Sequence, residues 1–173
     1  MTNQNRLVNI STVFVRIALV LNGGLLAAIG LGLIVSLVLG NRFTVLLLGL
    51  DGSSQAGDTT WGVRCLMLVG LIAFGATQYI FLVLDRLVRS VAADDPFMEG
   101  NADRIRRIAW ALLAVQMLDF PMMAIRHSFP GLGHAVPDNG LSLSGWLAVL
   151  MLFILARVFT MGTSMRDYLR ETV

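Results

Sequence analysis

Long apolar runs alternate with short polar segments along this chain. Four of the runs approach or exceed the length of a membrane span: residues 17–39, 65–84, 108–125 and 143–162. A helix needs about 20 residues, each rising about 1.5 Å, to cross the hydrocarbon core of a bilayer. The runs are continuously apolar rather than alternating, so helices and not barrel strands are expected in lipid. The pattern predicts an all-α fold, an integral membrane four-helix bundle that forms a single domain over residues 1–173.

The composition agrees with this interpretation. Hydrophobic residues make up 56% and charged residues 14% of the 173 positions, whereas charged residues make up about 25% of an average soluble domain. The net charge of +2 is too small to favour nucleic-acid binding, and the single cysteine, Cys65, excludes a disulfide within one chain. The lipid bilayer is therefore the first partner that the sequence predicts, and direct nucleic-acid binding is not expected.

The arginines predict the orientation, and all thirteen basic residues are arginine. Nine of them lie in residues 1–16, in residues 85–107 and in the C-terminal tail. The opposite side carries three: Arg42, Arg64 and Arg126. Because positively charged loops remain in the cytoplasm, we expect both termini and the 85–107 segment to be cytoplasmic. The first run is longer than a signal-peptide core of about 7–15 residues, so we expect it to be an uncleaved helix.

The most polar stretch is VAADDPFMEGNADRIRRIAW, residues 91–110, between the second and third spans. The helical spacing of the preceding residues predicts that the second helix continues beyond the membrane. Pro96 disfavours a helical conformation at Asp95, and Gly100 permits a turn. Asn101 is a residue type that caps helix N-termini. The stretch therefore predicts a helical hairpin that protrudes from the membrane on the cytoplasmic side.

The segment DPFMEGNADRIRRIAWALL resembles a motif of a bacterial family of small four-helix membrane proteins known as domain of unknown function 2975. The motif combines Pro-Phe, a following Asn and a basic amphipathic start to the third helix. The matching positions are Asp95, Pro96, Phe97, Asn101, Arg104, Ile105, Arg107 and Ile108. The tail FTMGTSMRDYLRETV is similar to the family's ending, and Asp94 departs from the glycine that is frequent in the family. The resemblance implies a bacterial inner (cell) membrane protein.

The resemblance also implies a partner, because such proteins are often encoded beside a small helix-turn-helix DNA-binding regulator. The hairpin is the expected working surface, since Phe97 and Met98 are apolar side chains in a polar turn, as at many interfaces. The alternative is that Phe97 plugs the underside of the bundle and that the charges only solvate the turn. The candidate partner-binding residues are Asp94, Asp95, Phe97, Glu99, Arg104 and Arg107.

Polar residues inside the spans are rare and indicate candidate functional positions. Asn22, Gln78 and Arg157 lie about 7–9 Å from the expected cytoplasmic ends of their spans, at about 1.5 Å per residue. They could form one polar layer in the inner leaflet. The alternative is that Arg157 extends to the headgroups and that the two amides bond locally.

Asp119 lies deeper, about 16–17 Å from the expected cytoplasmic end of its span. Gln116 lies one turn before it, and Pro121, two residues later, frees a backbone carbonyl. We expect Asp119 to be protonated or hydrogen-bonded, with Arg126 or Arg64 as its partner. The alternatives are a proton-coupled or ligand-binding role and a protonated acid that faces lipid.

Small residues recur at every fourth position of the first span: Gly24, Ala28, Gly32, Ser36 and Gly40. Such a face allows another helix to approach closely. Two interpretations remain open: packing inside the bundle, and a homodimer through Gly24, Ala28, Gly32 and Ser36.

The function classes are narrowed by what the sequence lacks. We expect no catalytic residue, cofactor or metal, because no paired carboxylates share a depth, no HExxH motif occurs, and His127, His134 and Asp138 are weak indications of a metal site. The interpretation is a non-enzymatic membrane sensor or anti-regulator that binds a cytoplasmic protein. The alternative is a small membrane transporter or ligand-binding protein that uses Asp119. A small multidrug transporter would be expected to carry a glutamate within its first span; the spans of this chain contain none, so Asp119 is the possible substitute.

Overall fold

The fold is all-α with four membrane-capable helical segments, as predicted. The computed structural model describes residues 3–48, 56–92, 100–135 and 142–171, and their regular structure is entirely helical. The elements are α1 (Asn3–Leu39), α2 (Asn41–Leu48), α3 (Ala56–Ala92), α4 (Asn101–Met117), α5 (Asp119–Ser128), the 3-10 helix η1 (Pro130–Ala135) and α6 (Leu143–Glu171). The segments that are long and apolar enough to cross a membrane are Ser11–Leu39, Thr59–Ser90, Asn101–Ser128 and Leu143–Met165.

The helices extend beyond the apolar runs from which they were predicted. α1 is continuous from Asn3, and α3 continues to Ala92. The extension of α3 was predicted from the helical spacing of LDRLVRSVAA. A charged residue ends an apolar run, but it does not end a helix, because arginine is a good helix former.

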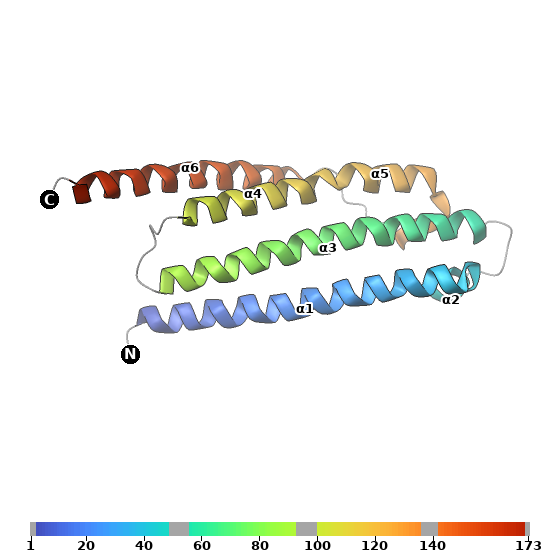
Figure 1. Cartoon of the computed structure of the whole chain (residues 1–173). Helices are drawn as coiled ribbons and strands as arrows, with labels where there is room; N and C mark the ends of the chain where they lie inside the picture. Colours follow the sequence, from blue (N-terminus) through green and yellow to red (C-terminus); the bar gives the residue numbers. More distant parts are fainter. Residues whose placement is uncertain (1–2, 49–55, 93–99, 136–141, 172–173) are drawn as a thin grey trace.

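The four spans lie side by side in the order α1, α3, α4, α6 (Figure 1). α1 contacts α3, α3 contacts α4, and α4 contacts α6, whereas α1 touches neither α4 nor α6 within the described ranges. The bundle is therefore open, with α1 and α6 at its edges. Both chain termini, the end of α3 and the start of α4 lie at one end of the row, called here the terminal end, and α2 and η1 lie at the other, called the α2 end.

Many large apolar side chains face outward from this row. Val20 of α1 is 75% exposed, Val38 is 78% exposed, and α6 exposes a comparable set. In water such surfaces would be unfavourable, but lipid tails are as apolar as these side chains. Contacts between the spans therefore depend on close packing and on polar side chains, and these contacts define the candidate sites.

The largest group of buried apolar side chains lies at the α2 end. Val63 and Val69 of α3 pack with Ile125 of α5 and Leu132 of η1. Phe43 of α2 packs against the same group. The short helix α2 thus folds back onto the row.

Two glycines permit the chain path at this end. Gly40 follows α1 with a φ of +57°, in the left-handed region that glycine tolerates, and the chain turns there into α2. Gly62 of α3 lies directly against the loop around η1. A Cβ atom on Gly62 would lie 2.8 Å from Cγ of Phe129 and 2.9 Å from Cδ1 of Leu132, so no larger residue fits without a shift.

The third span is interrupted at Leu118. The backbone N–H of Leu118 donates to the carbonyl of Val115 at 3.0 Å, three residues back, and α5 then begins at Asp119. Pro121 has no N–H to donate to the carbonyl of Met117, four residues before it. The proline therefore accounts for the break, as its position in the sequence predicted.

Candidate functional site

A buried amide joins α3 to α4 at the terminal end. The side chain of Asn101, 1% exposed, accepts at Oδ1 a hydrogen bond from Oγ of Ser90 at 3.0 Å and another from Nη1 of Arg104 at 2.8 Å. Ser90 is itself buried in the last turns of α3. A buried polar group is unfavourable without partners, so these bonds make the junction specific as well as close.

The expected capping role of Asn101 is wrong. The N-cap position of α4 is Gly100, which has a φ of 96° and makes no side-chain cap hydrogen bond, and the N–H of Arg104 donates to its carbonyl at 2.9 Å. Asn101 is the first helical residue, and its side chain turns inward towards α3. Burial against Ser90 thus outweighs the local preference of asparagine for the cap.

Sequence reasoning missed Ser90 as the partner in this junction. A signal was available, because Ser90 falls at helical spacing from Val83 and Leu87 on the face that α3 turns inward. A single hydroxyl among apolar positions on such a face indicates a polar contact with a neighbouring helix.

Arginines surround the junction. Arg86, Arg89, Arg106 and Arg107 are exposed. Two of them form ion pairs on their own helices: Arg89 Nη2 donates to the buried Asp85, and Arg106 Nη2 lies 2.6 Å from Oδ1 of Asp103. The described surface of the terminal end is therefore predominantly positive.

The candidate partner-binding residues divide into two groups. Asp94, Asp95, Phe97 and Glu99 lie outside the described residues. Arg107 is exposed, whereas Arg104 is half-buried and donates to Asn101. Arg104 thus supports the junction, and of these two arginines Arg107 is the one that presents its side chain outward.

The expected polar layer within the spans contains two of its three members. Nδ2 of Asn22 on α1 donates to Oε1 of Gln78 at 2.7 Å and to the carbonyl of Phe74 at 3.0 Å, both on α3. Tyr79, beside Gln78, is exposed. The amide pair joins the first two spans, which agrees for these two residues with the polar-layer interpretation and not with local bonding.

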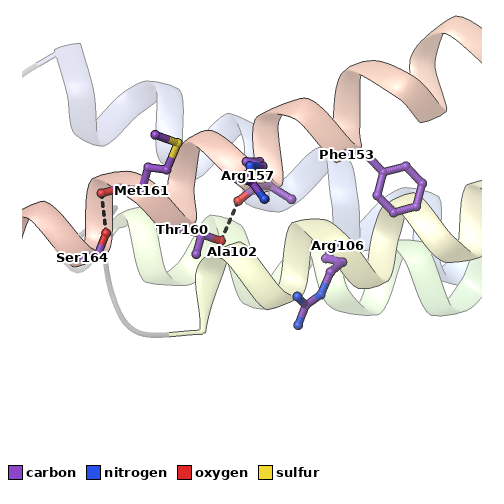
Figure 2. Close-up of a pocket in the computed structure, with 8 residues that line it drawn as sticks. Ala102, Arg106, Phe153, Arg157, Thr160, Met161 and Ser164 are labelled. Carbon is purple, nitrogen blue, oxygen red and sulfur yellow. Dashed lines mark hydrogen bonds between the residues drawn. The ribbon is translucent and has the colours of Figure 1, made fainter.

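Arg157 is the member that lies elsewhere. It lines a cavity of about 400 Å³ between α4 and α6 together with Ala102 and Arg106 (Figure 2). Ala102 and Arg106 belong to the first turns of α4, so Arg157 lies level with the charged terminal end. Gln78 lies twelve residues before Ser90 along α3, a rise of about 18 Å. Arg157 and Gln78 are about equally far from the predicted ends of their spans, but they do not lie at the same level along the row. The reason is that α6 is displaced along its axis relative to α3.

Gln116 contacts α6. Its Nε2 donates to the carbonyl of Ser142 at 3.3 Å, and a Cβ atom on Gly145 would lie 2.2 Å from that nitrogen. Gly145 therefore allows the buried amide to lie directly against the α6 backbone. Sequence reasoning missed Gly145, which is a small residue in the first turn of an apolar helix.

Asp119 is the first residue of α5, and its Oδ2 is buried with no hydrogen-bond partner among the described residues. The expected pairing with Arg64 is wrong, because Arg64 donates to Ser36 of α1. Arg126, the other expected partner, is exposed further along α5. The structure thus places Asp119 at the helix break without the expected Arg64 contact.

The small residues at every fourth position of α1, called here the small-residue ladder, lie in two different environments. Ser36 is fully buried and bonds to Arg64, and a Cβ atom on Gly32 would lie 3.5 Å from Cε of Met67 on α3. Gly24 and Ala28 are exposed. Residues four apart advance about 40° beyond a full turn, so the ladder winds around the helix. In this conformation only Gly24 and Ala28 remain accessible for the homodimer interpretation.

These features define a multi-pass α-helical membrane protein whose spans are joined by a few buried polar contacts. The chain belongs to the family described as "Protein of unknown function (DUF2975)", which matches residues 45–173. The match begins within α2 and includes α3 to α6, which confirms the resemblance seen in the hairpin motif and the tail. No curated protein and no solved structure matches the chain.

Proposed function

We propose that this protein is a non-enzymatic membrane sensor or anti-regulator that binds a cytoplasmic protein at its terminal end. In this proposal the terminal end faces the cytoplasm of a bacterium and the protein lies in the inner membrane. The arginine asymmetry supports this orientation. The terminal end carries both chain termini, and the ends of α3 and α4 expose arginines there: Arg86, Arg89, Arg106 and Arg107.

The hydrogen bond between Ser90 and Asn101 carries the proposal. These residues lie on either side of residues 93–99, and their side chains are 3.0 Å apart in a buried position. The two ends of this connection are therefore held at a defined separation. A recognition segment whose ends are held loses less conformational entropy on binding than one on a free loop.

The same junction between Ser90 and Asn101 can transmit a change in the membrane helices to the partner-binding segment. Ser90 belongs to α3, which contacts α1, α2, α4, α5 and η1. A change in how α3 packs against its neighbours would alter the spacing at Asn101 and thus the segment that follows α3. The proposed partner is a small helix-turn-helix transcription regulator, which is the class that the family resemblance implies.

Binding tests use the full chain in detergent and the purified helix-turn-helix regulator encoded beside it. We expect charge reversal at Asp94, Asp95 and Glu99 together to abolish co-purification and to leave the melting temperature unchanged. Arg107→Glu tests the candidate partner-binding arginine on α4 that is exposed, and it is expected to weaken binding. Arg42→Glu, at the α2 end, is the matched control and should bind as the wild type does. Undiminished binding by the triple variant would refute the surface, and a gene with no such neighbour would count against the partner.

Asp119 supports a second candidate, a small transporter or ligand-binding protein. Its Oδ2 is buried without a partner among the described residues, next to the helix break at Leu118. A carboxyl group in such a position is expected to serve a function when it serves no structural contact. In proteoliposomes containing a pH-sensitive dye, the transporter candidate predicts a proton flux that Asp119→Asn abolishes. Absence of flux in the wild type, or equal flux in Asp119→Asn and Asp119→Ala, would end the proton-coupled form of this candidate.

A further inference from the structure

The cavity between α4 and α6 combines charge, hydroxyl groups and an apolar wall. Arg157, Thr160 and Ser164 contribute polar groups from α6. Arg106 lines the cavity from α4, with its guanidinium directed away from α6 (Figure 2). Phe153, at the far side from Ser164 along α6, contributes an aromatic ring. Among the residues that the structure describes, no aspartate or glutamate lines the cavity. An anionic, amphipathic ligand matches this lining.

The two arginines differ in their availability. Arg157 has no hydrogen-bond or ion-pair partner in the part of the chain that the structure describes. Arg106 pairs with Asp103 at 2.6 Å, but both side chains are more than half exposed, and such surface pairs contribute little. A phosphate group can therefore bind Arg157 directly, while Arg106, turned towards Asp103, adds positive charge nearby.

The hydroxyl groups of the cavity are oriented as acceptors. Oγ1 of Thr160 donates its proton to the carbonyl of Ala156 at 3.0 Å, and Oγ of Ser164 donates to the carbonyl of Met161 at 2.9 Å. Each oxygen keeps lone pairs that can accept a hydrogen bond. A ligand that carries hydroxyl groups beside its phosphate satisfies these acceptors and the guanidinium donors together.

The position of the cavity distinguishes a lipid from a soluble anion. Arg157 lies about two turns before the end of the apolar segment Leu143–Met165 and level with the first turns of α4, at the boundary between apolar and charged surface. Exposed apolar residues flank Arg157 on α6: Ile154, Leu155, Val158 and Met161. The described residues supply no counter-ion to Arg157, and at this boundary the headgroup of an anionic lipid can supply one.

An aromatic pair continues the cavity towards the apolar part of the row. The ring of Phe153 meets that of Trp110 on α4 edge to face, with centroids 5.3 Å apart. Trp110 is exposed, and tryptophan prefers the boundary between headgroups and acyl chains. The pair offers an acyl chain a rigid apolar surface next to the charged site.

We propose that this cavity binds one anionic glycerophospholipid. Its phosphate pairs with Arg157, its headgroup hydroxyls donate to Thr160 and Ser164, and one acyl chain lies along Phe153 and Trp110. Lipid binding at this site does not depend on the proposed protein partner, although Arg106 lies at the same terminal end.

The test measures lipid preference on the full chain in detergent. Melting temperature and native mass spectrometry are recorded after addition of phosphatidylglycerol or phosphatidylcholine. We expect phosphatidylglycerol to raise the melting temperature of the wild type and to remain bound, and phosphatidylcholine to do neither. Arg157→Gln should lower the phosphatidylglycerol affinity by about fivefold, which corresponds to one basic residue near an anionic lipid. Arg86→Gln, an exposed arginine of α3 at the same end, is the matched control and should keep the preference.

Two further arms keep the test decisive. Thr160→Leu fills the cavity without changing charge at an exposed position, and it should abolish the preference even where Arg157→Gln folds poorly. Glycerol phosphate and inorganic phosphate, added alone, should not reproduce the stabilisation. Equal stabilisation by a free phosphate, or an unchanged lipid preference in Thr160→Leu, would overturn the proposal.

Discussion

Arg64 of α3 donates twice to Ser36 of α1, from Nη2 to the backbone carbonyl at 2.8 Å and from Nε to the hydroxyl at 3.3 Å. The same carbonyl also accepts from the N–H of Gly40 at 3.1 Å, in the last turn of α1. A guanidinium is favourable at this place, because the C-terminal end of a helix carries partial negative charge. The ring of Trp61 lies 5.1 Å from the guanidinium carbon and supports the arrangement through a cation–π contact.

Loss of the two hydrogen bonds from Arg64 to Ser36, called here the Arg64 clamp, should destabilise the protein. We expect Arg64→Leu to reduce the free energy of unfolding by about 1.5–3 kcal/mol, the range for hydrogen bonds that involve a charged group. Thermal unfolding in detergent measures the effect. Arg42→Leu removes an exposed arginine of α2 and should change stability by less than about 0.5 kcal/mol. Equal melting temperatures for the two variants would contradict the clamp.

The amide pair of the first two spans should show measurable coupling. Asn22→Ala removes the donor to Gln78 and to the carbonyl of Phe74, so we expect it to cost about 0.5–2 kcal/mol, as for other hydrogen bonds between membrane helices. A double-mutant cycle with Gln78→Ala isolates the pair. Additive effects of the two substitutions would show that the amides do not interact.

Gly62 and Gly75 of α3 form a matched pair for a packing test. In Gly62→Ala the new methyl group meets Phe129 and Leu132 at under 3.0 Å, so we expect a loss of about 1–3 kcal/mol from overpacking. Nothing lies within 4 Å of a Cβ atom on Gly75, so Gly75→Ala should be neutral or stabilising by up to about 1 kcal/mol. If both variants unfold at the wild-type temperature, then the η1 loop does not rest on α3 as described.

The junction at the terminal end should depend on Asn101 more than on nearby surface charge. We expect Asn101→Ala to cost about 1–3 kcal/mol, because it removes a buried amide oxygen that accepts from both Ser90 and Arg104, although Ser90 keeps its bond to the carbonyl of Leu87. Asp103→Ala breaks an exposed ion pair and should cost at most about 1 kcal/mol. Unfolding in detergent ranks the two, and the reverse order would show that the buried amide is not the main contact.

The proposed orientation predicts which residues an impermeant thiol reagent reaches. In a Cys65→Ser background, Ser144→Cys near the start of α6 should react in intact cells, and Asp103→Cys at the terminal end should react only after permeabilisation. Both positions are exposed. Labelling of Asp103→Cys from outside would reverse the orientation and with it the proposed cytoplasmic partner.

The sequence by itself determined the spans, the break in the third span and the continuation of α3 beyond its apolar run. These features depend on local properties: the length of an apolar run, the missing N–H of Pro121, and the spacing of apolar residues after Leu84. In lipid the backbone must be satisfied within each helix, so local sequence is sufficient to define a span. The similar depth of Asn22 and Gln78 was readable from the sequence, but whether the two amides bond to each other or locally stayed open.

Only the tertiary structure decided how the helices are offset and which polar groups meet. The displacement of α6 along its axis places Arg157 beside Ala102 instead of beside Gln78. The order of the row directs Arg64 to Ser36 and leaves Asp119 without that partner. Asn101 turns inward because Ser90 lies opposite it, which no property of residue 101 alone reveals. The axial offset of a helix and the face that it turns inward are set by its packing against other helices. In lipid no strong hydrophobic force acts between helices, so neither property can be predicted from the sequence of one span alone.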